Sequence, residues 1–473
     1  MKQHESLRFL RKNRRNIITE YLGPSQILVV GFMLVILIAS LLLMLPISSN
    51  EGTFTPFIDA LFTATSAVCV TGLVVVNTLA HWSTFGKIVI LFCIQVGGLG
   101  FMTLVSMIFI VLGRKITLRN RLIMQEALNF NTTAGIVKFT RYIVTGTFLV
   151  EGIGAILLAC VFVPEYGIFK GIIYGIFHSI SAFCNAGFDI IGDSSLTPYM
   201  GNTLLNLTIM ALIVIGGLGF TVWVDTLNAI THKIKTKERF TWRQAFYKMS
   251  VHSRLVWIIT IFLLVFGFVF FFFAELKNPA TLAGLSFKEK LYTAMFQSVT
   301  TRTAGFNTLP LDAMTDGSKL MSIILMFIGG SPAGTAGGIK TVTIGVLILC
   351  TLSTLKGSDE TVVFKRKIPR QIIRRALAII MIVISVMTTM TIILSFTEDF
   401  SFIEILYEVV SATATVGITL GITSSLSFIG KIVIIIAMFI GRLGPITIAV
   451  ALMIKQDKNK AIIEYPEEKV MVG

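Results

Sequence analysis

Several apolar stretches of the chain run for about 20 residues without a charged side chain, the length at which an α-helix crosses the apolar core of a bilayer. They include residues 27–45, 255–274, 320–339 and 376–396. The sequence is 54% hydrophobic and 14% charged, whereas soluble domains are about 25% charged. We therefore expect an all-α polytopic membrane protein. No small-residue cleavage site follows the first apolar run, so we expect a retained helix and not a signal peptide.

The net charge of +15 is concentrated in a few segments of the chain. Of the 40 Lys and Arg residues, 30 fall in segments 2–15, 113–141, 230–254, 356–375 and the tail after 454. Cytoplasmic loops of membrane proteins carry such an excess, so these segments and both termini are predicted to be cytoplasmic. Attraction to anionic lipid or to an acidic partner is a further interpretation. A nucleic-acid partner is not expected.

The sequence offers little support for catalysis or for a bound cofactor. Its five cysteines and five histidines show no metal-ligand spacing, which disfavours a zinc site or a disulfide framework. There is no Walker loop and no dinucleotide-binding fingerprint in a strand–helix context. We expect no enzyme activity and no cofactor in this chain. A polytopic membrane enzyme or an assembly scaffold is the alternative class, and a carboxylate, His or Ser cluster on paired spans would favour the enzyme.

One short segment recurs four times along the chain. "FIDALFTATSAVCVTGL" (57–73) aligns without a gap with "FIEILYEVVSATATVGI" (402–418), and "IIYGIFHSISAFCNAGF" (172–188) and "KLYTAMFQSVTTRTAGF" (290–306) follow the same pattern. The aligned glycines are Gly72, Gly187, Gly305 and Gly417. The amphipathic part of each copy is too short to cross a membrane, so it is expected to enter and return from the outer side.

A second glycine signature follows each of these segments. It reads "GGLGF" at 97–101, "GGLGF" at 216–220, "GGSPAGTAGG" at 329–338 and "GRLGP" at 441–445, at offsets of 25, 29, 24 and 24 residues. Each repeat is predicted to contain an apolar span, a pore helix, a glycine-ended strand and a second span, giving eight transmembrane helices around a pseudo-fourfold pore. The predicted organisation is a basic N-terminus (1–25), repeats at 26–113, 139–230, 255–355 and 372–454, and a cytoplasmic tail (455–473).

Non-helical backbone at membrane depth must be buried in protein or line a wet cavity. Four equivalent strands around one axis satisfy this condition, and their carbonyl oxygens can replace the water around a monovalent cation. The expected filter residues, which would bind K⁺, are Val70, Thr71, Gly72, Asn185, Ala186, Gly187, Thr303, Ala304, Gly305, Thr415, Val416 and Gly417. The competing interpretation is that these glycines only permit close helix packing.

The sequence resembles the Ktr/Trk/HKT superfamily of potassium-translocating membrane subunits, and most of all its Ktr branch. The resemblance covers nearly the whole chain and includes "HSISAFCNAGF", "TTRTAGFNTL", "TVGITLG", "FIGRLGP" and "EYPEEKVMVG". It implies a homodimer in a bacterial-type cell membrane, on a cytoplasmic ring of nucleotide-binding regulatory subunits. Ser at the first filter position goes with sodium transport in plant relatives, so Gly72 implies potassium. A sodium-permeable or sodium-coupled transporter is the alternative within this fold.

Two features on the cytoplasmic side of the predicted filter are candidates for control of the pore. Segment 329–338 is too rich in glycine to remain a regular helix, and it is either a movable gate, as the resemblance implies, or a static kink. Arg442 lies mid-span, where it is either an electrostatic barrier to K⁺ or a cap on carbonyls of the third span. The candidate gate residues are Gly329, Gly330, Ser331, Pro332, Gly334, Thr335, Gly337, Gly338 and Arg442. Pro332 departs from relatives that lack proline here.

Two further charged residues are predicted to lie within the membrane. Arg302 precedes Gly305 by three residues, and it is expected to point behind the strand and to pair with an acid such as Glu408. Glu151 is either a coupling site for transport or a hydrogen-bonded structural acid. Lys340 follows the glycine-rich segment and is expected to face a cytoplasmic vestibule.

Overall fold

The computed structural model describes residues 23–100, 103, 118–127, 135–192, 194–236, 241–444 and 447. Nearly all the regular structure in these residues is helical, as the sequence predicts. Within the described ranges, four helices are each long and apolar enough to cross a membrane, namely α3 (Pro24–Met44), α9 (Ile136–Tyr166), α14 (Val251–Glu275) and α18 (Arg370–Thr397). The chain is therefore a multi-pass membrane protein. The predicted tail at 455–473 and most of the predicted N-terminal segment lie outside the described residues.

These long helices bury one face and leave the other exposed, although both faces are apolar. In α3, Leu28, Phe32 and Leu43 are buried, whereas Met33 and Leu37 are each at least half exposed. A helix that is apolar all round is stable only where its outer face meets lipid or more protein. Pro24 at the first turn fits the start of α3, because its fixed φ suits a helix and its missing N–H would have had no partner there.

Each of the four repeated segments begins with a short helix that we call a pore helix. The pore helices are α4 (Phe57–Cys69), α10 (Ile168–Phe183), α15 (Phe287–Thr300) and α19 (Phe402–Thr413). At 12 to 16 residues they are too short to cross a bilayer. The first turns of α15 and α19 are fixed by capping boxes, in which Ser286 pairs with Glu289 and Ser401 with Glu404. Each pore helix leads directly into its glycine-ended strand.

A full second span in every repeat stays a prediction, because in the first and fourth repeats the chain beyond the glycine signature lies almost wholly outside the described residues. The helices at these positions are α6 (Thr84–Leu99), α11 (Thr203–Gly217), α16 (Asp316–Phe327) and α20 (Phe428–Leu443). They contain 12 to 16 residues, and each ends at or beside the second glycine signature. In three repeats the fourth residue of that signature has a positive φ, which a helix cannot continue through: Gly100 at 78°, Gly219 at 91° and Gly444 at 83°.

In the second and third repeats the structure describes the helix that follows the break. The axis of α12 (Phe220–Thr236) is bent by 102° from that of α11. In the third repeat the apolar run 320–339 is not one helix, because α16 stops at Phe327 and α17 (Thr341–Leu355) starts 14 residues later. A bridge between Ile328 and Ile339 closes the segment between them into a loop. Glycine and proline, which disfavour a helix, explain this interruption.

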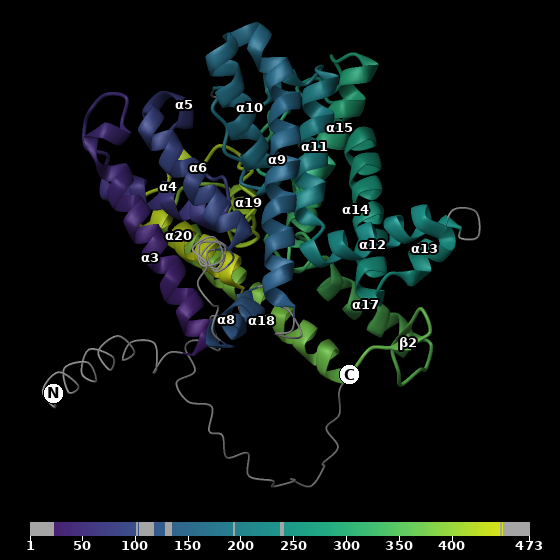
Figure 1. The fold of residues 1–473 in the computed structure, drawn as a ribbon. Coiled ribbons are helices and arrows are strands. Elements are labelled where there is room, and N and C mark those ends of the chain that lie inside the picture. Colours follow the sequence, from purple (N-terminus) through teal and green to yellow (C-terminus); the bar gives the residue numbers. More distant parts are fainter. Residues whose placement is uncertain are drawn as a thin grey trace, which may run out of the picture.

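The remaining elements are short connections between the larger helices. They are α5 (Thr78–His81), α8 (Leu118–Ala127), α13 (Trp242–Lys248), three 3₁₀ turns (Pro46–Ser48, Thr197–Tyr199, Thr423–Ser425) and a hairpin of β1 (Val362–Val363) and β2 (Arg366–Lys367). One hydrophobic core runs through all four repeats. Figure 1 shows α9 beside α11, with α12 and α13 extending sideways near the lower part of α14.

Candidate ion pathway

The four glycine-ended strands meet in one closed ring. Each glycine lies so close to the next strand that a Cβ would come within 3.0 Å of its backbone. These contacts run from Gly72 to Ala186, from Gly187 to Gly305, from Gly305 to Val416 and from Gly417 to Thr71. The first strand therefore contacts the second, the second the third, the third the fourth, and the fourth the first. Of the twelve predicted filter residues, eleven are buried and Gly305 is half-buried.

The four strands share one unusual backbone conformation. The residue two positions before each glycine has a left-handed φ: Val70 at 57°, Asn185 at 59°, Thr303 at 68° and Thr415 at 51°. The glycines themselves have φ between 67° and 94°, and the residue between the two is not left-handed. This alternation turns successive carbonyls toward the same side of a strand. A left-handed non-glycine residue costs on the order of 1–3 kcal/mol, so the surroundings must enforce the conformation four times over.

Side-chain hydroxyls at the ends of the pore helices fix the strands. In the first and fourth repeats the Gly72 and Gly417 N–H groups donate to Ser66 Oγ and Ser411 Oγ, at 3.0 and 3.1 Å. In the second repeat Ser181 Oγ donates instead to the carbonyl of Phe188, at 2.7 Å. These bonds tie the end of each of these three strands to its own pore helix.

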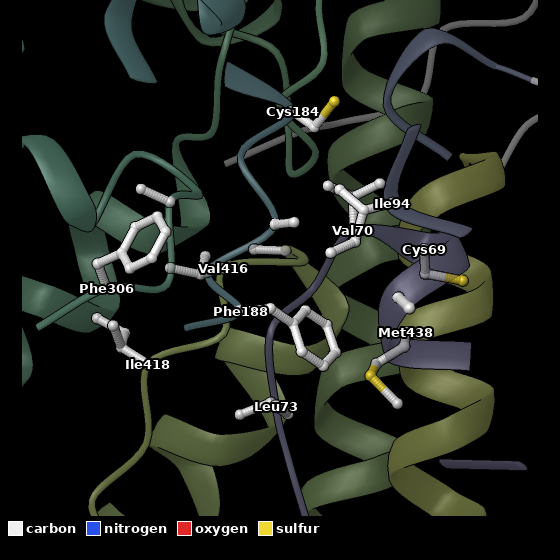
Figure 2. Close-up of a cluster of buried hydrophobic side chains, with 14 of the residues drawn as sticks. Cys69, Val70, Leu73, Ile94, Cys184, Phe188, Phe306, Val416, Ile418 and Met438 are labelled. Carbon is white, nitrogen blue, oxygen red and sulfur yellow. The ribbon is translucent and has the colours of Figure 1, made fainter. Parts of the chain in front are cut away.

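An apolar side chain follows each glycine and packs behind its strand. These residues are Leu73, Phe188, Phe306 and Ile418, and each is at most 1% exposed. Figure 2 shows them in one buried cluster with Val70 and Val416. Because the apolar residue after each glycine anchors its strand to the core, the glycine itself is held at the axis. An apolar residue follows the glycine in all four aligned repeats, and this shared position is a signal in the sequence for the anchor.

The segment 329–338, which we call the inner loop, is attached mainly to the second repeat. Its backbone N–H groups at Ser331 and Thr335 donate to the carbonyls of Gly217 and Gly216, at 2.9 and 3.2 Å. Thr335 Oγ1 donates to the Phe183 carbonyl at the end of α10, at 3.0 Å. None of the candidate gate residues in the loop is exposed. The loop is thus held directly beside the carboxyl end of a pore helix.

Arg442 joins three repeats through its guanidinium group. Nη1 donates to the Thr335 carbonyl of the inner loop at 2.5 Å, and Nη2 donates to the Gly97 carbonyl at the end of α6. A more distant Gly98 carbonyl lies 3.4 Å from Nη2. The carbonyl-capping role considered from the sequence is therefore present, and one of the capped carbonyls belongs to the third repeat. The guanidinium also borders the cavity described next.

A cavity of about 810 Å³ lies on the inner side of the strands. Its lining includes the inner loop, the end of α20 and part of α18, and it carries the cations Lys340, Arg375 and Arg442. Lys340 Nζ donates to the Ala336 carbonyl at 2.6 Å. The expectation that Lys340 borders a vestibule matches its place in this lining. Arg375 could not be assigned to the vestibule from the sequence, because its position depends on the tilt of α18.

The predicted pairing of Arg302 with Glu408 is wrong. Arg302 Nη2 donates to the Gly329 carbonyl at 3.1 Å, at the start of the inner loop. The Glu408 carboxylate accepts hydrogen bonds from the hydroxyls of Thr419 and Thr423 instead, at 2.6 and 2.5 Å. Hydroxyls thus satisfy Glu408 locally, whereas Arg302 has a backbone carbonyl as its partner and its buried Nη1 has no hydrogen-bond partner among the described residues. Arg302 connects the third strand with the inner loop.

Glu151 is a hydrogen-bonded acid behind the second strand. It is 4% exposed, and its carboxylate oxygens accept from Gln95 Nε2 at 3.2 and 3.3 Å. Cys184 Sγ, next to the filter residue Asn185, lies 3.8 Å from one of these oxygens. No ion pair includes Glu151 within the part of the chain that the structure describes. The geometry therefore corresponds to the structural interpretation of this residue.

An ion pair between the first and fourth repeats was missed at the sequence level. Lys431 Nζ lies 2.7 Å from Asp59 Oδ1, and each side chain is less than one-fifth exposed. Asp59 is in the first turn of α4 and Lys431 in that of α20. The sequence does contain a signal for a special position of this lysine, because the tetrapeptide "GKIV" occurs both at 86–89 and at 430–433. The pair closes the ring of repeats on the outer side of the fourth and first strands.

Comparisons with known proteins agree with this architecture. The family model described as "TrkH: Cation transport protein" matches residues 4–462. The chain is 41% identical to the potassium/sodium uptake protein NtpJ of Enterococcus hirae, over 96% of this chain and 98% of that protein. It is 40% identical to the Ktr system potassium uptake protein B of Bacillus subtilis, over 95% and 97% respectively.

A solved structure has the same fold. The potassium transporter TrkH from Vibrio parahaemolyticus superposes with a TM-score of 0.68, over 89% of this chain and 84% of that one, at 21% sequence identity. At this level of identity the similarity concerns the fold. It agrees with the closed arrangement of pore helices and strands derived above from the contacts.

Proposed function

Because the chain belongs to the TrkH family of cation transport proteins, we propose that it takes up potassium ions across a cell membrane through the ring of glycine-ended strands. The observation that carries the proposal is the identical backbone conformation of the four strands around one axis. Their carbonyl oxygens replace the water of a dehydrated cation, and the membrane potential drives the ion inward.

The charges around the ring suit a monovalent cation. The four strands contain no carboxylate, whereas a divalent-cation site would normally include one. The pore helices end at the strands, so their carboxyl ends carry the partial negative charge of the helix dipole toward the axis. Neutral carbonyls and helix ends attract K⁺ without binding it so tightly that it cannot leave.

Potassium is the preferred ion in this proposal, with sodium as the second candidate. The relatives compared above include potassium uptake proteins, and Gly72 leaves no hydroxyl in the first strand. The name of one relative, a potassium/sodium uptake protein, is the specific observation that favours the second candidate. A sodium-permeable or sodium-coupled version would use the same ring of strands.

The inner loop and Arg442 form the gate in this proposal. The loop borders the cavity through which an ion leaving the strands would pass, and Arg442 holds it through Thr335. A cation at this wall also raises the electrostatic energy of K⁺ in the cavity. Opening then requires the loop to leave its hydrogen-bond partners on α11 and α10.

In this proposal a second protein controls the opening of the gate, because this sequence has no nucleotide-binding fingerprint of its own. The proposed partner is a cytoplasmic ring of nucleotide-binding subunits, and the relatives named as parts of a Ktr system support it. The basic loops and both termini face the cytoplasm in this arrangement, and the transporting chain forms a homodimer in a bacterial-type cell membrane.

Growth of a host that lacks its own potassium uptake systems tests the proposed function. The native chain, expressed with a Ktr-type regulatory subunit, should restore growth at low external potassium. A matched chain with Gly305→Asp places a carboxylate in the ring and should fail to restore it. Equal growth with both chains at equal membrane abundance would reject the ring as the ion pathway.

A further inference from the structure

Helices α12 and α13 form an arm that leaves the bundle sideways, and we call these two helices the α12–α13 arm. The 102° bend after α11 turns α12 nearly perpendicular to the helix that precedes it. Figure 1 shows the arm extending beside the lower end of α14. Helices that cross a membrane run roughly along its normal, so a helix bent by about this angle points along the membrane plane.

The arm is held together as one unit on its inward face. Ala229 of α12 packs with Ala245 of α13 and with Met249, and the partly buried rings of Phe246 and Trp257 pack against them. On the exposed side of the arm, Lys248 Nζ lies 2.6 Å from His232 Nε2, which adds a polar contact between the two helices. Asp225 accepts from the hydroxyls of Ser250 and Ser253, both at 2.6 Å, and so fixes the arm to the start of α14.

The outward face of the arm combines apolar, aromatic and basic residues. Leu227 is 60% exposed, Ile234 66% and Trp242 67%, and Tyr247 is more than half exposed. The same two helices carry the cations Lys233, Lys235, Arg243 and Lys248. Their one acid is Asp225, which is already occupied by the two serines. Large exposed apolar side chains next to Lys and Arg are characteristic of helices that lie in a membrane interface.

We propose that the α12–α13 arm lies in the cytoplasmic leaflet and binds anionic phospholipid headgroups. The apolar and aromatic side chains enter the boundary between headgroups and acyl chains, and the basic side chains contact the phosphates. The charge complementarity favours anionic over zwitterionic lipid. The proposal rests on the cytoplasmic orientation proposed above, because anionic lipids are concentrated in that leaflet in the cell.

The arm is continuous with the inner loop. The N–H of Phe220, the first residue of α12, donates to the Ala333 carbonyl of the loop at 2.7 Å. A Cβ on Gly219 would lie against the Pro332 carbonyl, so the bend and the loop are in direct backbone contact. A lipid bound to the arm therefore acts on the helix whose first residue holds the proposed gate.

Fluorescence of Trp242 in reconstituted protein tests the proposal without measuring transport. The full chain and its Trp242→Phe variant are placed in phosphatidylcholine vesicles that contain the same fraction of brominated phosphatidylglycerol or brominated phosphatidylcholine. The difference between the two chains isolates Trp242 from Trp82, Trp223 and Trp257. We expect both lipids to quench Trp242, with phosphatidylglycerol about threefold or more effective, because each nearby cation favours anionic lipid. The preference should fall as salt rises.

Matched charge variants show whether the arm itself selects the lipid. Replacing Lys233, Lys235, Arg243 and Lys248 by Gln should abolish the preference but keep quenching by phosphatidylcholine. Replacing Lys365, Arg366, Lys367 and Arg370 by Gln removes the same charge from the hairpin region and should leave the preference intact.

Absence of quenching by either lipid would place the arm outside the bilayer, against a protein partner or a second copy. Equal quenching by both lipids in the native chain would mean insertion without headgroup recognition. Either result overturns the proposal.

Discussion

Arg442 donates a hydrogen bond of 2.5 Å to the backbone carbonyl of Thr335, although the two residues are 107 positions apart in the sequence. The same guanidinium reaches the Gly97 carbonyl at the end of α6. Thr335 is bound at the same time to Gly216 and Phe183 of the second repeat. One residue of the inner loop is therefore held from two sides, and its release requires both sets of bonds to break.

Arg442→Ala should raise potassium flux through the isolated chain. The substitution removes a cation from the cavity wall and leaves the Thr335 and Gly97 carbonyls without this donor. An unsatisfied buried polar group costs roughly 1–3 kcal/mol, which is enough to shift the loop away from its described position. Uptake of a potassium tracer into vesicles under an imposed potential measures the effect, which should be severalfold.

Arg442→Lys separates the effect of the positive charge at this position from the effect of the hydrogen bonds that hold the inner loop. Lysine keeps the charge, but its single ammonium group cannot reproduce the two-nitrogen fork that joins the two carbonyls. If the fork holds the loop, flux should rise in this variant too, by less than in the alanine variant. Lower flux in both variants, with normal folding, would mean that Arg442 supports the pathway and is not a barrier.

Gly72→Ser should reduce the preference for potassium over sodium. A Cβ at this position would meet the Ala186 carbonyl, and φ at Gly72 is 94°, which side chains rarely adopt. Disturbing one coordinating layer should lower the preference by about 1–2 kcal/mol, or roughly five- to thirtyfold. Competition between potassium and sodium for uptake gives this ratio directly.

Gly421→Ser is the matched control for this substitution. Gly421 has a φ of 98° but nothing within 4 Å of its Cβ position, so it experiences the backbone strain without the contact to a neighbouring strand. Its ion preference should equal that of the native chain. If both serine variants change selectivity equally, backbone strain near the ring is responsible and Gly72 has no special place in the filter.

The Asp59–Lys431 pair should couple the first and fourth repeats energetically. A double-mutant cycle with Asp59→Asn and Lys431→Met should give a coupling free energy near or above about 1 kcal/mol, because both side chains are mostly buried. Thermal unfolding in detergent provides the stabilities. The half-exposed pair Lys367–Glu360 is the control, and its cycle should give a value close to zero. Equal coupling free energies in the two cycles would contradict the claim that Asp59 and Lys431 close the ring of repeats.

The basic hairpin should contribute to docking of the regulatory partner. Reversing Lys365, Arg366, Lys367 and Arg370 to Glu should weaken the complex while potassium flux persists without a response to nucleotide. Reversal of Lys170, Lys288 and Lys290, near the starts of the pore helices α10 and α15, and of Lys277, which follows α14, should leave the complex intact, because this side is predicted to face outward. Co-purification and nucleotide-dependent flux are the two readouts. Normal regulation by the hairpin variant would place the docking surface elsewhere.

The arrangement of the strands could be predicted because the same short sequence pattern occurs four times in the chain. Glycine at 72, 187, 305 and 417 follows a similar amphipathic stretch each time, and physics allows such strands in a membrane only when they are buried or line a cavity. Their adjacency in one ring therefore followed from the number of copies. The left-handed residues before each glycine could not be predicted, because Val70, Asn185, Thr303 and Thr415 share no residue type favoured there.

The breaks at the second glycine signatures were harder to predict, for a different physical reason. Apolar residues stand on both sides of "GGLGF" at 97–101 and 216–220, so composition alone does not show that the helix ends there. The glycines allow close approach to pore-helix carbonyls: a Cβ on Gly97 would meet the carbonyl of Val68, and one on Gly441 that of Thr413. Such contacts depend on tertiary geometry. The same holds for Arg302, whose partner is a backbone carbonyl 27 positions away and not an acid.

Ion flux in liposomes with defined gradients tests the central claim most directly. The purified chain with its regulatory partner is reconstituted in vesicles with equal sodium on both sides, and a potassium gradient is imposed with and without a membrane potential. We predict an inward potassium flux that follows the potential, proceeds without a sodium gradient, and exceeds sodium flux under a matched gradient. Equal sodium and potassium fluxes, or a potassium flux that requires a sodium gradient, would contradict a potassium-selective filter formed by the four strands.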